Sequence, residues 1–229
     1  MNNIKLCIFD VDGVIVNSRA LHYPSTASAL RDFGCEYSRE EDEAFGTIPT
    51  REKLERLSEC GQIQEEDIEK IWQLKDYHLC LNFDKGVLLN KNIKSLFQEL
   101  RSRDIYIALG SNARYSFLEK VVKALDVAQC INHITSAQNM ISKPDPYMYV
   151  QEMKRFEVEP DNTLIFEDSE VGRQAAYSSG AWVYEVDSYD ELSIEILNEI
   201  NSSSGQFKRP LPIYREQSKT NRLVYCVWI

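Results

Sequence analysis

The sequence predicts an α/β protein with a doubly wound parallel sheet and an inserted α-helical segment. Short apolar runs at 6–9, 105–109 and 163–166 each end in polar residues, as buried parallel strands do. From Gly86 onward, strand and helix patterns alternate, which is typical of a parallel sheet with crossover helices. Between residues 17 and 83, strand patterns disappear and helical spacing replaces them.

The first predicted strand, Leu6–Phe9, leads into Asp10, Asp12 and Gly13. Ligands of open α/β sheets bind beyond the carboxyl ends of the strands, so both carboxylates are expected in one crevice. The pair suits phosphoryl transfer, in which one carboxylate attacks phosphorus and the other moves protons to the leaving oxygen and from water. Two carboxylates this close favour a divalent cation nearby. The alternative is an Asp-Gly turn that ends a strand.

Residues 17–83 are expected to form an all-helical insertion, hinged near 15–18 and 83–88, between two parts of an α/β core at 1–16 and 84–202. Its first helix carries Pro24 near the first turn and ends before Gly34. Further helices are predicted around Leu54 and Leu57 and over 68–81.

The second part of the core is expected to build a site from loops at one edge of the sheet. Gly110-Ser111-Asn112 and Glu167-Asp168-Ser169 follow predicted strands, and Lys143 precedes a proline and a helix. The predicted elements are helix 92–102, strand 105–109, helix 115–125, strand 131–135, helix 146–156, strand 163–166, helix 170–179, strand 181–186 and helix 190–200.

Composition narrows the classes of partner. The 36 acidic and 26 basic residues give a net charge of −10, which argues against nucleic acid because such sites need clustered positive charge. No apolar stretch approaches the roughly 18 residues that span a membrane. The six scattered cysteines lack zinc-site spacing, so we expect buried reduced thiols and a cytoplasmic protein.

The C-terminal extension, 203–229, differs from the core. A Ser-rich linker is predicted at 201–205, followed by a basic stretch at 206–222 and an apolar, β-prone end at 223–229. An exposed strand of this kind is an aggregation hazard, so we expect it to dock on the core or on a partner, with self-association as one outcome.

The segment Asp10-Val11-Asp12-Gly13-Val14 resembles the first motif of the haloacid dehalogenase superfamily, in the branch of capped phosphatases and β-phosphoglucomutase-like phosphomutases. Ser111, Lys143 and Glu167-Asp168 match the second, third and fourth motifs in the same order. The resemblance implies a Rossmann-like core, with residues 17–83 as a helical cap.

By this resemblance, Asp10 is the nucleophile and Asp12 the general acid and base. Ser111, with Asn112 beside it, and Lys143 would hold the phosphoryl group, since a small hydroxyl, a backbone N–H and an ammonium suit its oxygens. Mg²⁺ would be held by the side chains of Asp10 and Asp168, by the backbone carbonyl of Asp12, and by Glu167 directly or through water. Read singly, these residues also fit a Gly-Ser-Asn turn, a surface lysine and an acidic helix N-terminus.

Three further residues carry open alternatives. His22 resembles a cap histidine of the β-phosphoglucomutases that contacts substrate or assists proton transfer, and it also fits an ordinary helix histidine. Arg51, in the Gly46–Glu52 segment that resembles a cap loop, either grips a substrate anion or lies in solvent after a Thr50 N-cap. Arg114 is a second candidate for an anion contact, although a surface charge is the favoured interpretation.

These observations favour a Mg²⁺-dependent phosphatase of a small phosphorylated metabolite, with sugar phosphates as the expected class and an aspartyl-phosphate intermediate. A β-phosphoglucomutase-like phosphomutase would use the same core residues. A hypothesis of another class is a non-catalytic binding protein that acts through its C-terminal extension.

Overall fold

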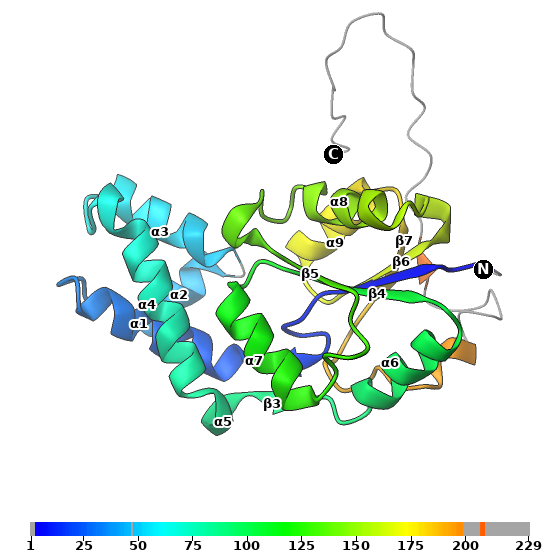
Figure 1. Ribbon diagram of the computed structural model, residues 1–229. Helices are drawn as coiled ribbons and strands as arrows, with labels where there is room; N and C mark the ends of the chain where they lie inside the picture. The colour runs from blue at the N-terminus through cyan, green and yellow to red at the C-terminus, as the bar shows by residue number, and fades with distance from the viewer. Residues whose placement is uncertain (1–2, 47, 199–206, 209–229) are drawn as a thin grey trace, which may run out of the picture.

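The computed structural model describes residues 3–46, 48–198 and 207–208. These residues form a six-stranded sheet with the order β5-β4-β1-β6-β7-β8, in which the first five strands are parallel and β8 is antiparallel to β7 (Figure 1). The strands are β1 (Leu6–Phe9), β4 (Tyr106–Ser111), β5 (His133–Ser136), β6 (Thr163–Glu167), β7 (Trp182–Glu185) and β8 (Phe207–Lys208). The predicted α/β fold class is confirmed.

Two pairs of helices cover the sheet. One face packs against α6 (Ile93–Ser102) and α7 (Tyr115–Leu125), and the other against α8 (Tyr147–Phe156) and α9 (Glu170–Ser178) (Figure 1). Alternate residues of β1 join the two apolar cores, Cys7 and Phe9 the first and Leu6 and Ile8 the second. This burial on both faces explains why the strand sequence is continuously apolar.

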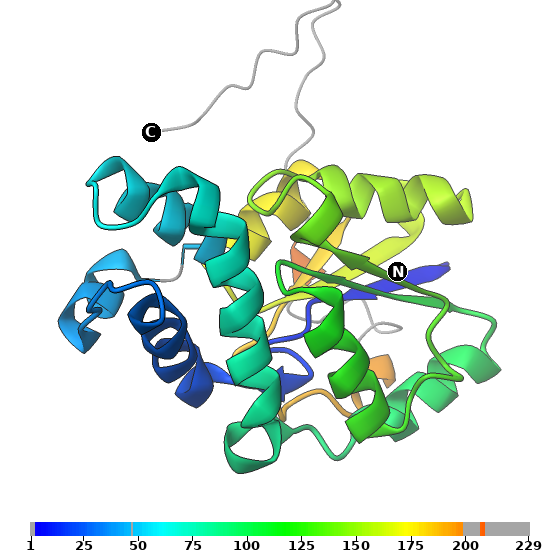
Figure 2. The ribbon, with the colours of Figure 1, turned by 60° about the vertical axis from the view of Figure 1, so that its left-hand side comes forward.

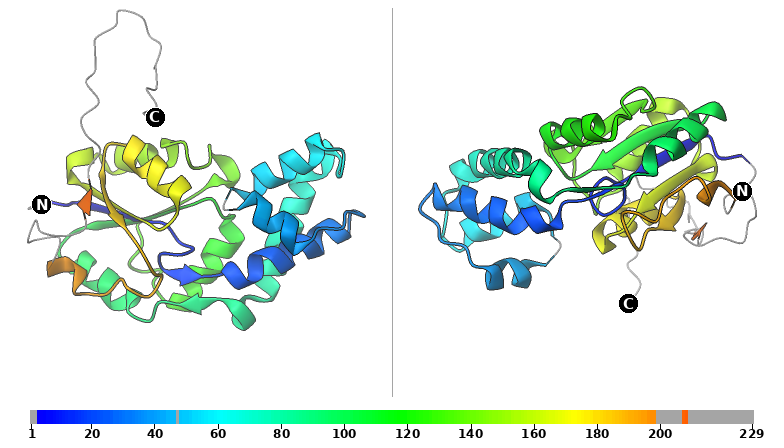
Figure 3. Two further views of the ribbon diagram at one scale, coloured as in Figure 1. Left: turned by 180° about the vertical axis from the view of Figure 1, so that it is seen from behind. Right: turned by 90° about the horizontal axis from the view of Figure 1, so that it is seen from below.

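A group of helices is inserted between β2 (Val16–Asn17) and β3 (Leu88–Leu89), which pair antiparallel close to the predicted hinges. We call residues 19–81 the helical insertion. It comprises α1 (Arg19–Arg31), α2 (Arg39–Phe45), α3 (Thr50–Glu59), the 3₁₀ turn Glu65–Asp67 and α4 (Ile68–Leu81), and it is followed by the short α5 (Phe83–Gly86). The insertion has an apolar core of its own and lies at one end of the sheet, opposite the N-terminus (Figures 2 and 3).

Two helices of the insertion differ from the expectation. The sequence did not predict α2, which has no buried residue and therefore no apolar stripe. It begins at a capping box in which Ser38 Oγ accepts from the Glu41 N–H and the Glu41 carboxylate accepts from the Ser38 N–H. In α1, Pro24 lies in the second turn. The helix continues through it because Leu21 and Leu30 on either side are packed in the interior.

The predicted last helix, 190–200, is wrong over its first half. Among the described residues only 196–198 are helical there. Glu191 accepts hydrogen bonds from the backbone N–H groups of Asp187 and Ser188, each at 3.0 Å, and the Leu192 carbonyl accepts from Asn90 Nδ2 at 2.9 Å. These bonds compete with the helical pattern and delay its start.

The expectations for 201–206 and 209–229, and for Cys226, lie outside the described residues. Lys208 of β8 forms an ion pair with Glu185 of β7 at 2.6 Å. Of the described cysteines, which form no disulfide, Cys7, Cys35 and Cys130 are buried as expected, whereas Cys60 is exposed. No helix in the described ranges combines the length and the apolar character needed to cross a bilayer.

Candidate active site

The carboxyl ends of β1, β4 and β6 meet at one edge of the sheet. Phe9 is in register with Leu109 of β4 on one side and with Phe166 of β6 on the other, so Asp10 follows between the last residues of these two strands. The Asp10 N–H donates to the Phe166 carbonyl at 3.0 Å, which continues the pairing by one residue. Gly13 then adopts φ +93°, which lets the chain turn back tightly after Asp12.

Lys143 joins two of the acidic side chains that the sequence singled out. Its Nζ lies 2.6 Å from Asp10 Oδ1 and 2.5 Å from Glu167 Oε1, and its side chain is 4% exposed. Asn112 holds the lysine's backbone, because its Oδ1 accepts from the Lys143 N–H at 2.9 Å and its Nδ2 donates to the Lys143 carbonyl at 3.3 Å. Ser111 is also buried, and its Oγ accepts from the Ala113 N–H at 3.2 Å.

Glu167 is a buried carboxylate with one bonded and one open oxygen. Oε1 accepts from Lys143 and from the Tyr149 hydroxyl, while Oε2 is buried without a partner among the described residues. Burial raises the pKa of Glu167 to about 7, and the Lys143 ammonium opposes that shift. Tyr149 could not be singled out from the sequence, because it lies on the apolar face of a helix.

Three carboxylates form a group that fits a divalent cation. Oxygens of Asp10, Glu167 and Asp168 all lie within 4.8 Å of one another. A Cβ at Gly13 would lie 2.0 Å from Asp168 Oδ2, and one at Gly172 would lie 2.0 Å from Glu167 Oε2, so the two glycines make room for these carboxylates. Hard oxygen donors in a charged cluster are the ligands that Mg²⁺ prefers, and Oε2 of Glu167, which has no partner among the described residues, is such a donor. The residues present therefore fit the metal.

The cluster also concentrates negative charge. Burial raises the pKa of Asp168 to about 6, with a further contribution from Asp10. Burial likewise raises the pKa of Asp10, against the lowering effect of Lys143. A bound dication would oppose both increases in pKa, because it favours the ionised carboxylates.

Asp12 lies in a separate hydrogen-bond network with the helical insertion. Its Oδ1 accepts from the Ser18 N–H at 2.7 Å, and its Oδ2 accepts from Ser18 Oγ at 2.7 Å and contacts His22 Nε2 at 2.6 Å. Burial acts to raise the pKa of Asp12, but the hydrogen bonds from His22 and Ser18 outweigh it and lower the pKa to about 2. The structure thus brings His22 from the insertion against this carboxylate.

Lys75 of α4 extends the network, with Nζ 3.3 Å from His22 Nδ1. An ammonium can only donate, so Nδ1 is assigned as the acceptor and the ring proton is assigned to Nε2, facing Asp12. Lys75 is buried, and burial lowers its pKa. The sequence did not indicate Lys75 or Ser18. These two residues contact His22 and Asp12 only once the helices are packed, so no pattern in the sequence singles them out.

The guanidinium groups of Arg51 and Arg114 both lie near the ring of Trp72 in α4. Arg51 is largely exposed, with Nε 3.1 Å from Glu55 Oε1, and its guanidinium lies 5.9 Å from the Trp72 ring centre. The Thr50 N-cap that formed part of the second alternative is wrong, since α3 begins at Thr50 itself. The Arg51 side chain faces solvent in this structure, and its contact with a substrate anion stays a prediction.

The favoured interpretation of Arg114 as a surface charge is wrong. Arg114 is 7% exposed, with its guanidinium 4.7 Å from the Trp72 ring centre and 2.8 Å from Glu69 Oε1. It therefore ties the loop after Ser111 to the helical insertion. A single arginine in a sequence does not indicate such a contact.

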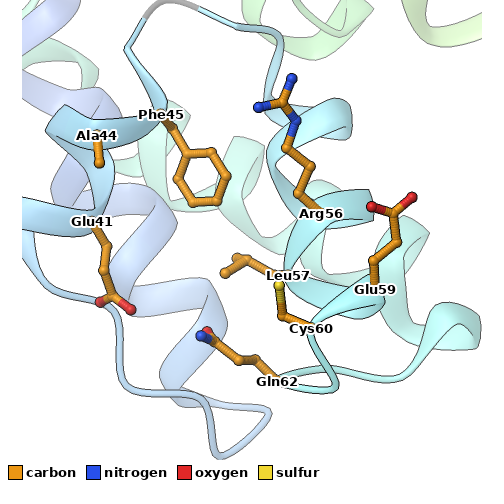
Figure 4. Close-up of a pocket in the computed structure, with 8 residues that line it drawn as sticks. All are labelled: Glu41, Ala44, Phe45, Arg56, Leu57, Glu59, Cys60 and Gln62. Carbon is orange, nitrogen blue, oxygen red and sulfur yellow. The ribbon is translucent and has the colours of Figure 1, made fainter.

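A cavity of about 470 Å³ lies elsewhere, between α2 and α3. Phe45 and Leu57 line it from the two helices, with Arg56 and Cys60 beside them (Figure 4). None of its lining residues belongs to the carboxylate cluster. The cavity is thus separate from the candidate active site.

The chain matches the model of the haloacid dehalogenase-like hydrolases over residues 7–186. It belongs to this family. The resemblance noted from the four motifs is thereby confirmed. Because the match runs from within β1 to just beyond β7, it covers the parallel strands, the helical insertion and every residue of the candidate active site.

Among curated proteins, the chain is 24% identical over 178 residues to a phosphorylated carbohydrates phosphatase of Thermotoga maritima, covering 77% of this chain and 82% of that one. It is 24% identical over 184 residues to a β-phosphoglucomutase of Bacillus subtilis, covering 77% and 80%. A solved structure of CbbY from Rhodobacter sphaeroides, in complex with phosphate, has a TM-score of 0.70 at 22% identity and covers 82% of this chain and 96% of its own. The structural likeness supports the shared fold.

Proposed function

We propose that this haloacid dehalogenase-like hydrolase is a Mg²⁺-dependent phosphatase of small phosphorylated metabolites, with sugar phosphates as the substrate class. The observation that carries the proposal is the position of Asp10, which lies beside the Lys143 ammonium and in one cluster with the carboxylates of Glu167 and Asp168. A nucleophilic carboxylate needs such a cation beside it to approach an anionic phosphate ester. The phosphatase names of several relatives support the same class of reaction.

In the first step, the Asp10 carboxylate attacks phosphorus and the bond from phosphorus to the leaving oxygen breaks. Asp12 gives a proton to that oxygen. In the second step, Asp12 takes a proton from water, the water oxygen attacks the aspartyl phosphate, and inorganic phosphate leaves with Asp10 restored. Ser111 and Lys143 hold the phosphoryl oxygens during both steps.

Asp12 is ionised at neutral pH in this structure, so it must gain a proton before it acts as an acid. His22 Nε2 lies 2.6 Å from Asp12 Oδ2 and supplies that proton. Lys75 then donates a proton to Nδ1, on the other side of the ring. Burial of Lys75 favours this transfer, because it disfavours the charged ammonium. We call His22 and Lys75 the proton relay. When Asp12 acts as a base, the protons move back from Asp12 to His22 and from His22 to Lys75.

Mg²⁺ held by Asp10, Glu167 and Asp168, with the Asp12 carbonyl as the family resemblance implies, would neutralise negative charge on the transferring phosphoryl group. The insertion supplies both His22 and Lys75, so we propose that residues 17–83, which include the insertion, act as a cap whose closure excludes water. Arg114 and Arg51 at Trp72 are the proposed contacts for a second anionic group of the substrate. A cytoplasmic location, without nucleic-acid or membrane partners, remains our expectation.

A phosphomutase is the second candidate, favoured by the contact between His22 and Asp12 and by the β-phosphoglucomutase among the relatives. It would use the same first step and return the phosphoryl group to a reoriented substrate. A binding role for the C-terminal extension, including self-association, is a separate hypothesis. Removal of residues 203–229 would test it by a change in oligomeric state in solution.

The test of the phosphatase proposal is phosphate release from a panel of sugar phosphates and related metabolites, with and without Mg²⁺. Release that requires Mg²⁺ and disappears in Asp10→Asn supports it. Isomerisation of a sugar phosphate without phosphate release would favour the phosphomutase. A wild type that catalyses neither reaction would contradict both the phosphatase and the phosphomutase proposal.

A further inference from the structure

Arg19 connects the base of the helical insertion to the candidate metal site. It is the first residue of α1 and follows β2 after a single residue, Ser18. Its Nη2 lies 3.0 Å from Asp168 Oδ2, an ion pair between residues 149 positions apart in the chain. The pair therefore joins the start of the insertion to a carboxylate that follows β6 of the core.

The two members of this pair differ in their surroundings. The Arg19 side chain is 74% exposed, whereas the Asp168 side chain is 9% exposed and lies against Gly13. An ion pair with such an exposed cation contributes little to folding, since water solvates the guanidinium almost as well. Breaking the ion pair between Arg19 and Asp168 therefore lowers the folding stability only slightly, and Asp168 stays in place.

Asp168 is also one of the three carboxylates of the proposed metal site. A guanidinium beside it repels an incoming dication and neutralises part of the charge that attracts the ion. We propose that Arg19 competes with the divalent cation for Asp168, so that metal binding releases the base of the helical insertion from the core. This inference rests on the metal site of the proposed function.

The position of Arg19 gives the competition a consequence for the rest of the site. Ser18 and His22, on either side of it in the chain, both contact Asp12. A displacement of Arg19 therefore acts at the start of the same helix that carries the proton relay. Metal occupancy and the placement of the relay are coupled through α1.

The test is Mg²⁺ binding to metal-free protein without substrate, measured by isothermal titration calorimetry, with Mn²⁺ binding followed by electron paramagnetic resonance as a second probe. Arg19→Gln should bind both ions about fivefold more tightly, the size expected for loss of one exposed charge interaction. Arg19→Lys, which keeps the charge, should stay within about twofold of the wild type. Arg31→Gln is the matched control, because this exposed arginine in the last turn of α1 carries the same charge.

A second readout uses thermal unfolding. A fixed Mg²⁺ concentration should raise the melting temperature of Arg19→Gln more than that of the wild type or Arg31→Gln, because tighter binding stabilises the native state further. Equal or weaker binding in Arg19→Gln would overturn the competition and leave the phosphatase proposal standing. A wild type that binds neither ion would overturn the metal site and this inference together.

Discussion

Replacing Gly172 by alanine sets two effects of opposite sign against each other. Gly172 lies in the first turn of α9, where alanine should stabilise the helix by about 1 kcal/mol through its higher propensity. The added Cβ, however, would lie 2.0 Å from Oε2 and 2.2 Å from Cδ of Glu167. Because Glu167 is fully buried, its carboxylate has to shift within a packed interior.

The shift would weaken the hydrogen bonds that Glu167 accepts from Lys143 and Tyr149. Charge-assisted bonds of this kind contribute about 1.5–3 kcal/mol each, so the loss exceeds the gain in helix propensity. We expect Gly172→Ala to lower the free energy of unfolding by about 2–4 kcal/mol and to weaken Mg²⁺ binding. Urea denaturation and calorimetric titration of the same preparation measure both.

The matched control is the same substitution in a Glu167→Ala background, where the clash is absent. There Gly172→Ala should stabilise the protein by about 1 kcal/mol, and the difference between the two backgrounds measures the coupling. A stabilised Gly172→Ala single variant with unchanged Mg²⁺ affinity would refute the packing that we infer around this carboxylate.

Three further predictions follow from the same contacts. Lys143→Met leaves two buried carboxylates without their cation, so phosphate release should vanish and urea denaturation should show a loss of about 3–5 kcal/mol; activity within tenfold of the wild type would contradict this. Tyr149→Phe should weaken Mg²⁺ binding about tenfold by calorimetry, whereas Tyr177→Phe, which removes a tyrosine–glutamate bond outside the site, should leave it unchanged. Because the pKa of Asp12 is lowered to about 2 in the folded protein, its contribution to stability is present above about pH 4 and is lost as the pH falls towards 2. His22→Gln should flatten that part of the stability profile, and an identical profile would count against the contact.

The core and its strand ends could be predicted because their sequence signals are local. The apolar residues of β1 and β6 identify buried strands, and parallel strands align their carboxyl ends, so Asp10 and Glu167 could be placed together. Their spacing to Ser111 and Lys143 then matched the family motifs. The sequence already indicated that these residues form a site, and the structure adds the strand order, the register and the distances between them.

The remaining site residues depend on contacts that no local pattern encodes. Arg19, Lys75 and Tyr149 acquire a role only when α1, α4 and α8 are packed against the core, and in the sequence they resemble ordinary helix residues. The burial of Arg114 has the same origin, since Glu69 and Trp72 come from a distant helix.

The central claim is that Asp10 becomes phosphorylated during turnover. The most direct test is acid-quench mass spectrometry of Asp12→Asn after reaction with Mg²⁺ and p-nitrophenyl phosphate, whose leaving group needs no proton. This variant keeps the nucleophile and lacks the base, so we expect one phosphoryl group on the peptide that contains Asp10, and none in Asp10→Asn. Phosphate release undiminished in Asp10→Asn, or a phosphoryl group on another residue, would contradict the account.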